Sequence, residues 1–210
     1  MKKLKILFCL LCVGLFFGAC EKSIQEAQED TPKQEYLEDL EIIANNGDKI
    51  AINQKIPQSY KNNFKNIEPT QKNTLKDLLI TSNKENIKVL FFFTTWCEPC
   101  VGILPHLENL QKQFGDKITI FGIGIDDLVG EVEDFNQTMQ VFIEENKITF
   151  PVAFKENRAE FFKALEGLEG IPLIVLYDEK GDYIIHYLGA IPEEMIEFDL
   201  SQNLAKMRAK

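Results

Sequence analysis

The chain has 210 residues, 45% of them hydrophobic, which is enough to bury the core of one domain and leaves room for appended segments. Acidic residues outnumber basic ones by 33 to 23, and the two arginines stand at positions 158 and 208, so the composition argues against a nucleic-acid-binding protein, which needs a basic surface. Five cysteines in a chain of this composition do not indicate a scaffold held together by disulfides.

The first 19 residues have the pattern of a targeting segment. A lysine-rich start precedes an apolar run over residues 6–17, which is too short for a comfortable membrane span. The run ends in small residues directly before Cys20. This ending resembles a bacterial lipoprotein cleavage site, which implies cleavage before Cys20 and acylation of that residue. Phe17 fits the site less well than the usual leucine, so ordinary signal cleavage and retention of the segment as an anchor stay open. All three routes place the remaining chain outside the cytoplasm.

Segments of different character follow the targeting segment. Residues 20–35 are expected to form a flexible tether, because the stretch 21–33 is polar and charged with almost no large apolar side chain. A hairpin is predicted around the turn from Asn45 to Asp48, since apolar residues precede and follow it. Residues 55–72, rich in Asn, Lys and Gln, predict a loop or irregular insert, and residues 74–79 predict a short helix.

A folded domain is expected to span residues 36–210, and its centre is a strand followed by a turn and a helix. Residues 87–93 show no polar–apolar alternation, which predicts a strand buried on both faces of a sheet. The turn carries the sequence Trp96-Cys97-Glu98-Pro99-Cys100, and residues 101–114 have the spacing of a helix. A second buried strand is predicted over residues 117–125.

A Cys-x-x-Cys sequence at a strand-to-helix turn is the arrangement that a redox-active dithiol needs. Cys97 is placed at the N-terminus of the helix, where unpaired N–H groups and the helix dipole favour the thiolate, the nucleophilic form. Two intervening residues bring the sulfur of Cys100 within reach of Cys97, so that Cys100 resolves a mixed disulfide. Pro99 suits the first helical turn, because its φ is fixed and it has no N–H to satisfy.

The rest of the chain alternates helices and strands. Helical spacing predicts helices over residues 131–146 and 157–167 and from Pro192 to the C-terminus, and extended segments are predicted over residues 148–154, 173–177 and 183–188. The last helix has acids in its first turn and basic residues in its last turn, an order that the helix dipole favours.

The motif Thr94-Thr95-Trp96-Cys97-Glu98-Pro99-Cys100 resembles the active site of the thioredoxin superfamily, and within it the TlpA/ResA-like branch of envelope-anchored thiol–disulfide oxidoreductases. Two further matches are Gly170-Ile171-Pro172 before an apolar strand and Pro105 in the helix after the dithiol. Together the matches cover residues 87–206. The resemblance implies an α/β thioredoxin fold: a central mixed sheet flanked by helices, with an N-terminal hairpin extension and a helical insert between the βαβ and ββα halves.

The resemblance also implies roles for residues around the dithiol. In the family, the tryptophan at the position of Trp96 covers the dithiol; the alternative is that Trp96 is an ordinary core aromatic. The family's proline at the position of Pro172 is cis and faces the dithiol. Ile171 then offers its backbone groups to an extended substrate segment, by analogy with strand addition. Glu98 is either a solvated acid of the first helical turn or a group that adjusts the pKa of the thiols and helps proton transfer.

Three positions depart from the family pattern. Thioredoxins usually carry a buried acid six residues before the first cysteine, and here that residue is Phe91. Some envelope members have a glutamate three residues after the second cysteine, and here that residue is Ile103. The lysine that commonly pairs with the buried acid is replaced by a neutral residue, assigned to Gly122. Because the acid and the lysine are both absent, neither leaves an unpaired buried charge. Their absence leaves the proton acceptor for Cys100 unassigned.

Four other interpretations of the cysteine pair compete with a redox dithiol. A zinc site needs two more ligands, and His106 and His186 fit no ligand pattern, so both are interpreted as satisfied surface or boundary histidines. A peroxiredoxin shares the threonine at position 94 but needs a proline where Leu90 stands and a nearby arginine. A copper-delivery module needs a wider cysteine spacing and a histidine. A purely structural disulfide stabilises little across so short a loop.

The sequence thus predicts a periplasmic thiol–disulfide oxidoreductase that is anchored to a membrane through Cys20 and needs no metal or other cofactor. The resemblance favours a reductase of specific protein disulfides, often in apocytochrome c maturation. Such a reductase needs a membrane electron donor, because the periplasm is kept oxidising. A disulfide-forming oxidase or isomerase, or a non-enzymatic copper-binding module of the same fold, is the alternative. Nucleic acid is not an expected partner.

Overall fold

The computed structural model describes residues 40–54, 74–155, 157–164 and 168–209, all within one of the two units into which the chain divides, Gln34–Lys210. The predicted targeting segment, Cys20, the tether and the predicted loop over residues 55–72 lie outside the described residues. No helix within the described ranges is long and apolar enough to cross a membrane.

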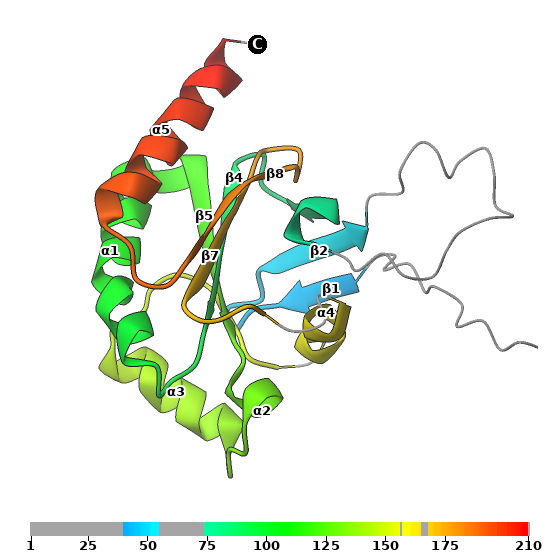
Figure 1. Ribbon diagram of the computed structural model, residues 1–210, viewed down its shortest axis with the longest axis vertical. Helices are drawn as coiled ribbons and strands as arrows, with labels where there is room; N and C mark the ends of the chain where they lie inside the picture. Colours follow the sequence, from blue (N-terminus) through cyan, green and yellow to red (C-terminus); the bar gives the residue numbers. More distant parts are fainter. Residues whose placement is uncertain (1–39, 55–73, 156, 165–167, 210) are drawn as a thin grey trace, which may run out of the picture. The chain divides into compact units, whose positions relative to one another are not determined.

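The centre of the fold is a mixed five-stranded sheet with the order β6-β5-β4-β7-β8 (Figure 1). Its strands are β4 (Ile87–Phe93), β5 (Ile118–Gly124), β6 (Val152–Ala153), β7 (Leu173–Tyr177) and β8 (Tyr183–Leu188). β4 pairs in parallel with β5 and antiparallel with β7. Every residue of β4 and β5 is buried, because nearly all their side chains are apolar and both faces of the sheet are covered. The predictions of two central buried strands are confirmed.

Three helices cover one face of the central sheet. They are α1 (Glu98–Phe114), α3 (Phe135–Glu145) and α5 (Glu193–Arg208). Their apolar side chains form one buried cluster with alternate residues of β4, and this cluster includes Cys97 and Cys100. Figure 1 shows α1 and α5 on the side of the sheet that faces away from β1 and β2. The predicted last helix is confirmed, with Pro192 as its N-cap residue.

A second sheet, with three antiparallel strands, covers the other face of the central sheet. Its strands are β1 (Leu40–Ile43), β2 (Lys49–Gln54) and β3 (Leu78–Ser82), in the order β1-β2-β3. Its inward side chains pack on Leu90, Phe92 and Tyr177 of the central sheet, together with Phe161 of α4 (Arg158–Ala164). The predicted hairpin is confirmed as β1 and β2, and β3 extends it to a sheet.

The prediction of a helix over residues 74–79 is wrong. Only a 3₁₀ turn, Leu75–Asp77, is present, and the chain continues as β3. Leu78 and Ile80 are both fully buried while the residue between them is partly exposed, which is the period-2 pattern of a strand. Two apolar positions are too few to distinguish this pattern from a helical one in the sequence, and pairing with β2 decides the outcome.

The helical insert between the two halves of the fold is present, but its elements differ from those predicted. A short helix, α2 (Asp126–Val129), follows β5 directly, and α3 begins later than the predicted helix over residues 131–146. The side chain of Asp134 caps α3 by accepting a backbone N–H of its first turn, which fixes this later start. The segment predicted as extended over residues 148–154 contains only the two-residue edge strand β6.

Hydrogen bonds join the two sheets at the end of the central sheet that is opposite to the cysteines. The N–H of Ile80 in β3 donates to the carbonyl of Gly181, in the turn between β7 and β8, at 3.0 Å. The hydroxyl of Tyr177 donates to a carbonyl of the 3₁₀ turn at 3.0 Å. Within the central sheet, Lys88, buried in β4, donates through Nζ to the carbonyl of Glu179, in the turn between β7 and β8, at 3.1 Å. Burial lowers the pKa of Lys88. This end of the sheet therefore helps to fix how the two layers pack, together with the hydrogen bonds between Asn45, in the turn after β1, and Val152 of β6.

Candidate active site

The two cysteines lie where β4 ends and α1 begins. Cys97 is the N-cap residue of α1, and its Sγ accepts a hydrogen bond from the N–H of Cys100 at 3.2 Å. The N–H of Cys97 donates to the carbonyl of Thr94 at 3.3 Å, which closes the turn between strand and helix. Pro99 stands in the first turn of α1, where it adds no unpaired N–H. The helix N-terminus therefore directs N–H groups toward the Cys97 sulfur, an environment that favours a thiolate.

A disulfide joins Cys97 to Cys100, and their Cα atoms are 5.2 Å apart. Cys97 is 6% exposed, whereas Cys100 is 0% exposed and packs within the apolar cluster between the sheet and the helices. An external sulfur can therefore approach Cys97 but not Cys100. This difference in exposure is what an attacking and a resolving cysteine require.

Trp96, Glu98 and Pro99 form an exposed rim beside the disulfide. Trp96 is 63% exposed, so it is not the core aromatic that the sequence left as an alternative. Glu98 and Pro99 are exposed in the first turn of α1. The accessible sulfur is thus flanked in the chain by an indole on one side and a carboxylate on the other.

The loop before β7 lies at the same end of the central sheet as the disulfide. Leu173, the first residue of β7, pairs with Phe92 of β4, so Pro172 is level with the last residue of β4. The peptide bond between Ile171 and Pro172 is cis, as predicted, and the Pro172 carbonyl accepts a hydrogen bond from the N–H of Gly189 at 2.8 Å. Ile171 packs against the cluster that contains both cysteines. The N–H and the carbonyl of Ile171 make no backbone hydrogen bond to another described residue.

Aromatic rings rather than charges fill the space behind the disulfide. Phe91 and Phe93 stack with their ring centroids 5.0 Å apart, and Phe93 also stacks on Phe142 of α3 at 5.6 Å. A Cβ atom at Gly122 would lie 3.2 Å from the ring of Phe93, so a lysine side chain there would crowd the packed rings. Ile103 is buried as well. All three positions that depart from the family pattern are therefore packed as part of the core.

A buried carboxyl group lies at the same end of the sheet, and the sequence interpretation gave it no role. Asp126 follows β5, is 0% exposed, and accepts two hydrogen bonds on Oδ1. The donors are the N–H of Thr95 at 2.8 Å and the hydroxyl of Thr95 at 2.5 Å. The carboxyl ends of neighbouring parallel strands meet at one edge of a sheet. An acid directly after the second buried strand was therefore the signal in the sequence that placed it near the dithiol.

Comparison with known proteins adds the family to this geometry. The model of the AhpC/TSA family matches residues 52–194, which is more than half of the chain. The chain belongs to the AhpC/TSA family. Its sequence relatives include the sporulation thiol-disulfide oxidoreductase A of Bacillus subtilis (strain 168), which is 28% identical over 116 residues, or 55% of this chain and 67% of the relative. The thiol-disulfide oxidoreductase ResA of Halalkalibacterium halodurans is 24% identical over 110 residues, or 51% of this chain and 57% of the relative.

Solved structures agree with this AhpC/TSA family member in fold. A thiol:disulfide interchange protein of the thioredoxin family from Chlorobium tepidum TLS matches with a TM-score of 0.52 at 17% identity, over 82% of this chain and 97% of that chain. The predicted α/β thioredoxin-like fold is confirmed by this likeness and by the mixed sheet flanked by helices. The match to ResA spans little more than half of that relative's length.

An ion pair holds the helical insert of this AhpC/TSA family member on the end of β5. Arg158, 4% exposed, donates to both carboxylate oxygens of Asp127, from Nη1 at 3.0 Å and from Nη2 at 2.9 Å. Nη1 also donates to the carbonyl of Gly124, and the guanidinium lies 4.8 Å from the ring centroid of Phe135 in α3. Its donors are thus engaged within the fold, and Leu90 is buried in the middle of β4. The arrangement therefore does not provide the proline and the arginine of a peroxiredoxin site.

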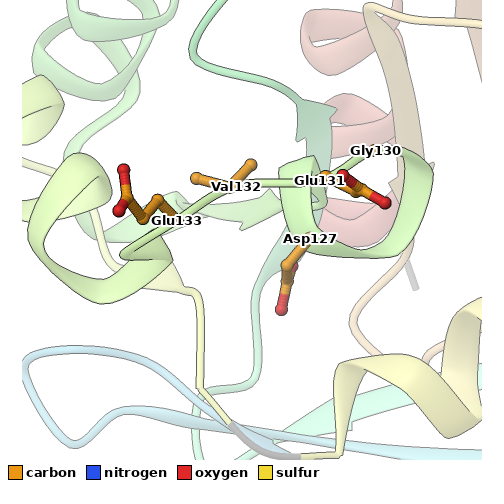
Figure 2. Close-up of a pocket in the computed structure, with 5 residues that line it drawn as sticks. All are labelled: Asp127, Gly130, Glu131, Val132 and Glu133. Carbon is orange, nitrogen blue, oxygen red and sulfur yellow. The ribbon is translucent and has the colours of Figure 1, made fainter.

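A surface pocket of about 600 Å³ adjoins α2, and Figure 2 shows the residues that line it: Asp127, Gly130, Glu131, Val132 and Glu133. The three carboxylates point in different directions, and Asp127 is paired with Arg158. They do not converge on a common point. Within the part of the chain that the structure describes, no group of three or more His, Cys, Asp or Glu side chains is arranged to hold a metal ion.

Both histidines have partners away from the disulfide. Nδ1 of His106 lies 2.7 Å from Oε2 of Glu193, which links α1 to the start of α5. Nδ1 of His186 lies 2.7 Å from the hydroxyl of Tyr183, on the same strand. Their interpretation as satisfied surface or boundary histidines is confirmed.

Proposed function

We propose that the protein is a thiol–disulfide oxidoreductase that exchanges electrons between its Cys97–Cys100 pair and disulfides of protein substrates. The observation that carries this proposal is a disulfide at the N-terminus of α1 in which Cys97 is slightly exposed and Cys100 is fully buried. Two sequence relatives that are named thiol-disulfide oxidoreductases support the same activity.

The proposed reaction proceeds through one mixed disulfide. In the reduced protein, the Cys97 thiolate attacks one sulfur of a substrate disulfide and releases the other substrate sulfur as a thiolate. Cys100 then loses its proton and attacks the Cys97 sulfur, which releases the second substrate thiolate and forms the Cys97–Cys100 disulfide. Two electrons pass to the substrate, and each released thiolate takes up a proton. The next cycle needs two electrons from a donor.

Substrate is proposed to bind as an extended segment beside the accessible sulfur. Ile171 supports this, because it lies one position beyond the end of β4 and forms no backbone hydrogen bond to another described residue. A segment that pairs with this backbone adds to the structure in the manner of an extra strand. The exposed indole of Trp96 offers an apolar surface next to Cys97.

Two cysteine variants test the proposed roles. Cys97→Ser is expected to abolish the reduction of insulin disulfides, because the attacking sulfur is lost. Cys100→Ser is expected to accumulate mixed disulfides, because the resolving sulfur is lost, and electrophoresis without reductant detects them. Accumulation in Cys97→Ser instead would reverse the two roles. Full exchange activity in both variants would contradict the oxidoreductase proposal.

Electron flow is proposed to run from the protein to its substrates. The resemblance to the TlpA/ResA-like branch supports this direction, and so does Glu98, whose exposed carboxylate opposes a thiolate at Cys97 and thereby weakens the protein as an oxidant. Equilibration of the purified protein with glutathione measures the reduction potential. A value of about −120 mV, that of the strong oxidant DsbA, would contradict a reductase and favour the disulfide-forming oxidase or isomerase.

The site of action is proposed to be the periplasmic side of the cell envelope, with the domain held by a lipid on Cys20. The lysine-rich start, the short apolar run and the small residues before Cys20 support this proposal. A membrane protein is then the expected electron donor, and the family resemblance suggests apocytochrome c as a substrate. Cys20→Ala is expected to leave the protein unprocessed or free of the membrane fraction. Unchanged fractionation together with unchanged electrophoretic mobility would contradict the anchor.

A further inference from the structure

The dithiol has no charged residue at the three positions where the family that the chain resembles carries one usually, commonly or in some members. One buried acid stands elsewhere at the same end of the sheet. Asp126 is the only aspartate or glutamate that is buried among the described residues. The N–H of Ile125 donates to the carbonyl of Phe93 at 3.0 Å, and this hydrogen bond joins the ends of β5 and β4. Asp126 is the next residue after Ile125. The carboxyl group therefore stands beside the turn that carries the dithiol.

The contacts of Asp126 go to that turn. Its Oδ1 accepts both the N–H and the hydroxyl of Thr95, two residues before Cys97. Hydrogen bonds to a carboxylate are stronger than those between neutral groups, so this pair restrains the Thr95 peptide firmly. The restraint passes through one residue to the N-cap position, where the Cys97 sulfur is aligned with the N–H of Cys100 at 3.2 Å.

The other oxygen of the same carboxyl group indicates that packing alone does not explain it. Oδ2 of Asp126 is buried and has no hydrogen-bond partner within the described residues, and the hydroxyl of Thr94 is in the same condition. An unpaired buried oxygen destabilises the fold, and an apolar side chain of similar size would avoid that cost. The neighbouring Asp127 has no such unpaired oxygen, because Arg158 binds both of its carboxylate oxygens.

We propose that Asp126 is a positioning residue of the dithiol, which acts through Thr95 to hold the Cys97 sulfur in line with the N-terminus of α1 and so sets the redox equilibrium of the pair. The inference rests on the proposed function, because it assumes that the disulfide is reduced and reformed. Reduction takes two electrons and two protons, both supplied in solution by glutathione, and the position of this equilibrium is the quantity that Asp126 controls.

The direction of the effect separates positioning from simple charge. Removing a negative charge beside the turn that carries the dithiol would by itself favour the thiolate and shift the equilibrium toward the dithiol. Losing the alignment of Cys97 with the helix N-terminus removes stabilisation of the thiolate and shifts the equilibrium toward the disulfide. We expect Asp126→Asn and Thr95→Val each to shift the equilibrium with glutathione toward the disulfide by about threefold or more, since each weakens a charge-assisted hydrogen bond.

The double variant tests the route through Thr95. If Asp126 acts through Thr95, the combination of Asp126→Asn and Thr95→Val shifts the equilibrium no further than the larger single change. Thr95→Ser, which keeps the hydroxyl, and Glu131→Gln, which removes an exposed charge of the same segment, are the controls and are expected to stay within about twofold of the unmodified protein. A cooperative thermal unfolding transition of each oxidised variant shows that the variant is folded. If Asp126→Asn does not fold, Thr95→Val alone tests the direction of the shift.

The outcomes also separate this inference from the proposed function. A shift toward the dithiol, no shift, or additive effects in the double variant would overturn the positioning role of Asp126. If the unmodified protein does not equilibrate with glutathione at all, the proposed function itself fails. If it equilibrates and the variants equal it, only the inference about Asp126 fails.

Discussion

The two ends of the central sheet differ in how their buried polar groups are paired. At the end away from the cysteines, Lys88 Nζ and the Tyr177 hydroxyl each donate to a backbone carbonyl. Asn86 keeps one unpaired oxygen there, yet its amide nitrogen donates twice. At the cysteine end, one oxygen of Asp126 and the hydroxyl of Thr94 lack partners within the described residues. We call the end with Lys88 and Tyr177 the stabilising end, because its buried donors are paired. The cysteine end accepts a cost in stability that accompanies the site.

The sharpest test of the stabilising end is Gly181→Ala. Gly181 has a φ of +88°, and a Cβ atom there would lie 2.5 Å from the carbonyl oxygen of Ile80. We expect the free energy of unfolding to fall by about 2–4 kcal/mol, because backbone strain adds to a clash with β3. Urea unfolding measures the change. The redox equilibrium with glutathione is expected to stay the same.

Gly47→Ala is the matched control for this change. Its φ of +89° is nearly the same, but no heavy atom lies within 4 Å of a Cβ at this position. Strain alone should therefore cost about 1 kcal/mol. Equal losses in the two variants would show that the contact between β3 and the turn after β7 contributes nothing.

Arg158→Met probes the cysteine end through the insert. The change removes the bidentate partner of Asp127 and frees α2, whose first residue is Asp126. We expect a loss of about 2–3 kcal/mol in the free energy of unfolding, since a largely buried ion pair is broken from one side. The redox equilibrium should move as well, in contrast to Gly181→Ala. Arg208→Met, at the exposed end of α5, is the control; an equal loss there would contradict the role of the ion pair.

The buried lysine at the stabilising end predicts a dependence on pH. Burial lowers the pKa of Lys88 from its ordinary value of 10.5, so in the window just below that value the unfolded chain binds the proton more tightly than the folded protein. The free energy of unfolding should therefore rise with pH through this window, relative to Lys88→Met. Chemical unfolding at several pH values measures the difference. Lys117→Met, at an exposed site, is expected to show no such trend.

Glu98→Gln is expected to have the smallest effect, and it acts at the cysteine end. Removing the exposed carboxylate beside Cys97 should favour the thiolate and shift the equilibrium with glutathione toward the dithiol, by about twofold or less because solvent screens the charge. Glu194→Gln, an exposed acid in the first turn of α5, is the control. A shift toward the disulfide would contradict the role given to Glu98.

The central strands and the turn with the cysteines could be predicted from the sequence because their signals are local. A run such as Ile87–Phe93 is apolar on both faces, and a Cys-x-x-Cys before a helical pattern marks a helix N-terminus. The cis peptide bond before Pro172 followed from the family resemblance, since nothing local distinguishes it from an ordinary proline at the start of a strand.

The features that the sequence did not reveal depend on pairing between distant segments. β3 has only Leu78 and Ile80 as inward apolar residues, and its partner β2 decides its conformation. The contact of Asp126 with Thr95 requires that β5 lie directly beside β4 in parallel register. Arg158 reaches Asp127 across 31 positions of the chain, a separation at which no sequence spacing predicts an ion pair.

The exposure of Trp96 has a practical consequence for measuring this protein. It is the single tryptophan of the chain, it is 63% exposed, and it is the neighbour of Cys97. Disulfides quench the fluorescence of nearby indoles, so reduction of the Cys97–Cys100 bond should brighten the emission of the whole protein. The chain therefore carries its own optical reporter, and stopped-flow mixing with a thiol should follow the opening of the disulfide in real time without any label.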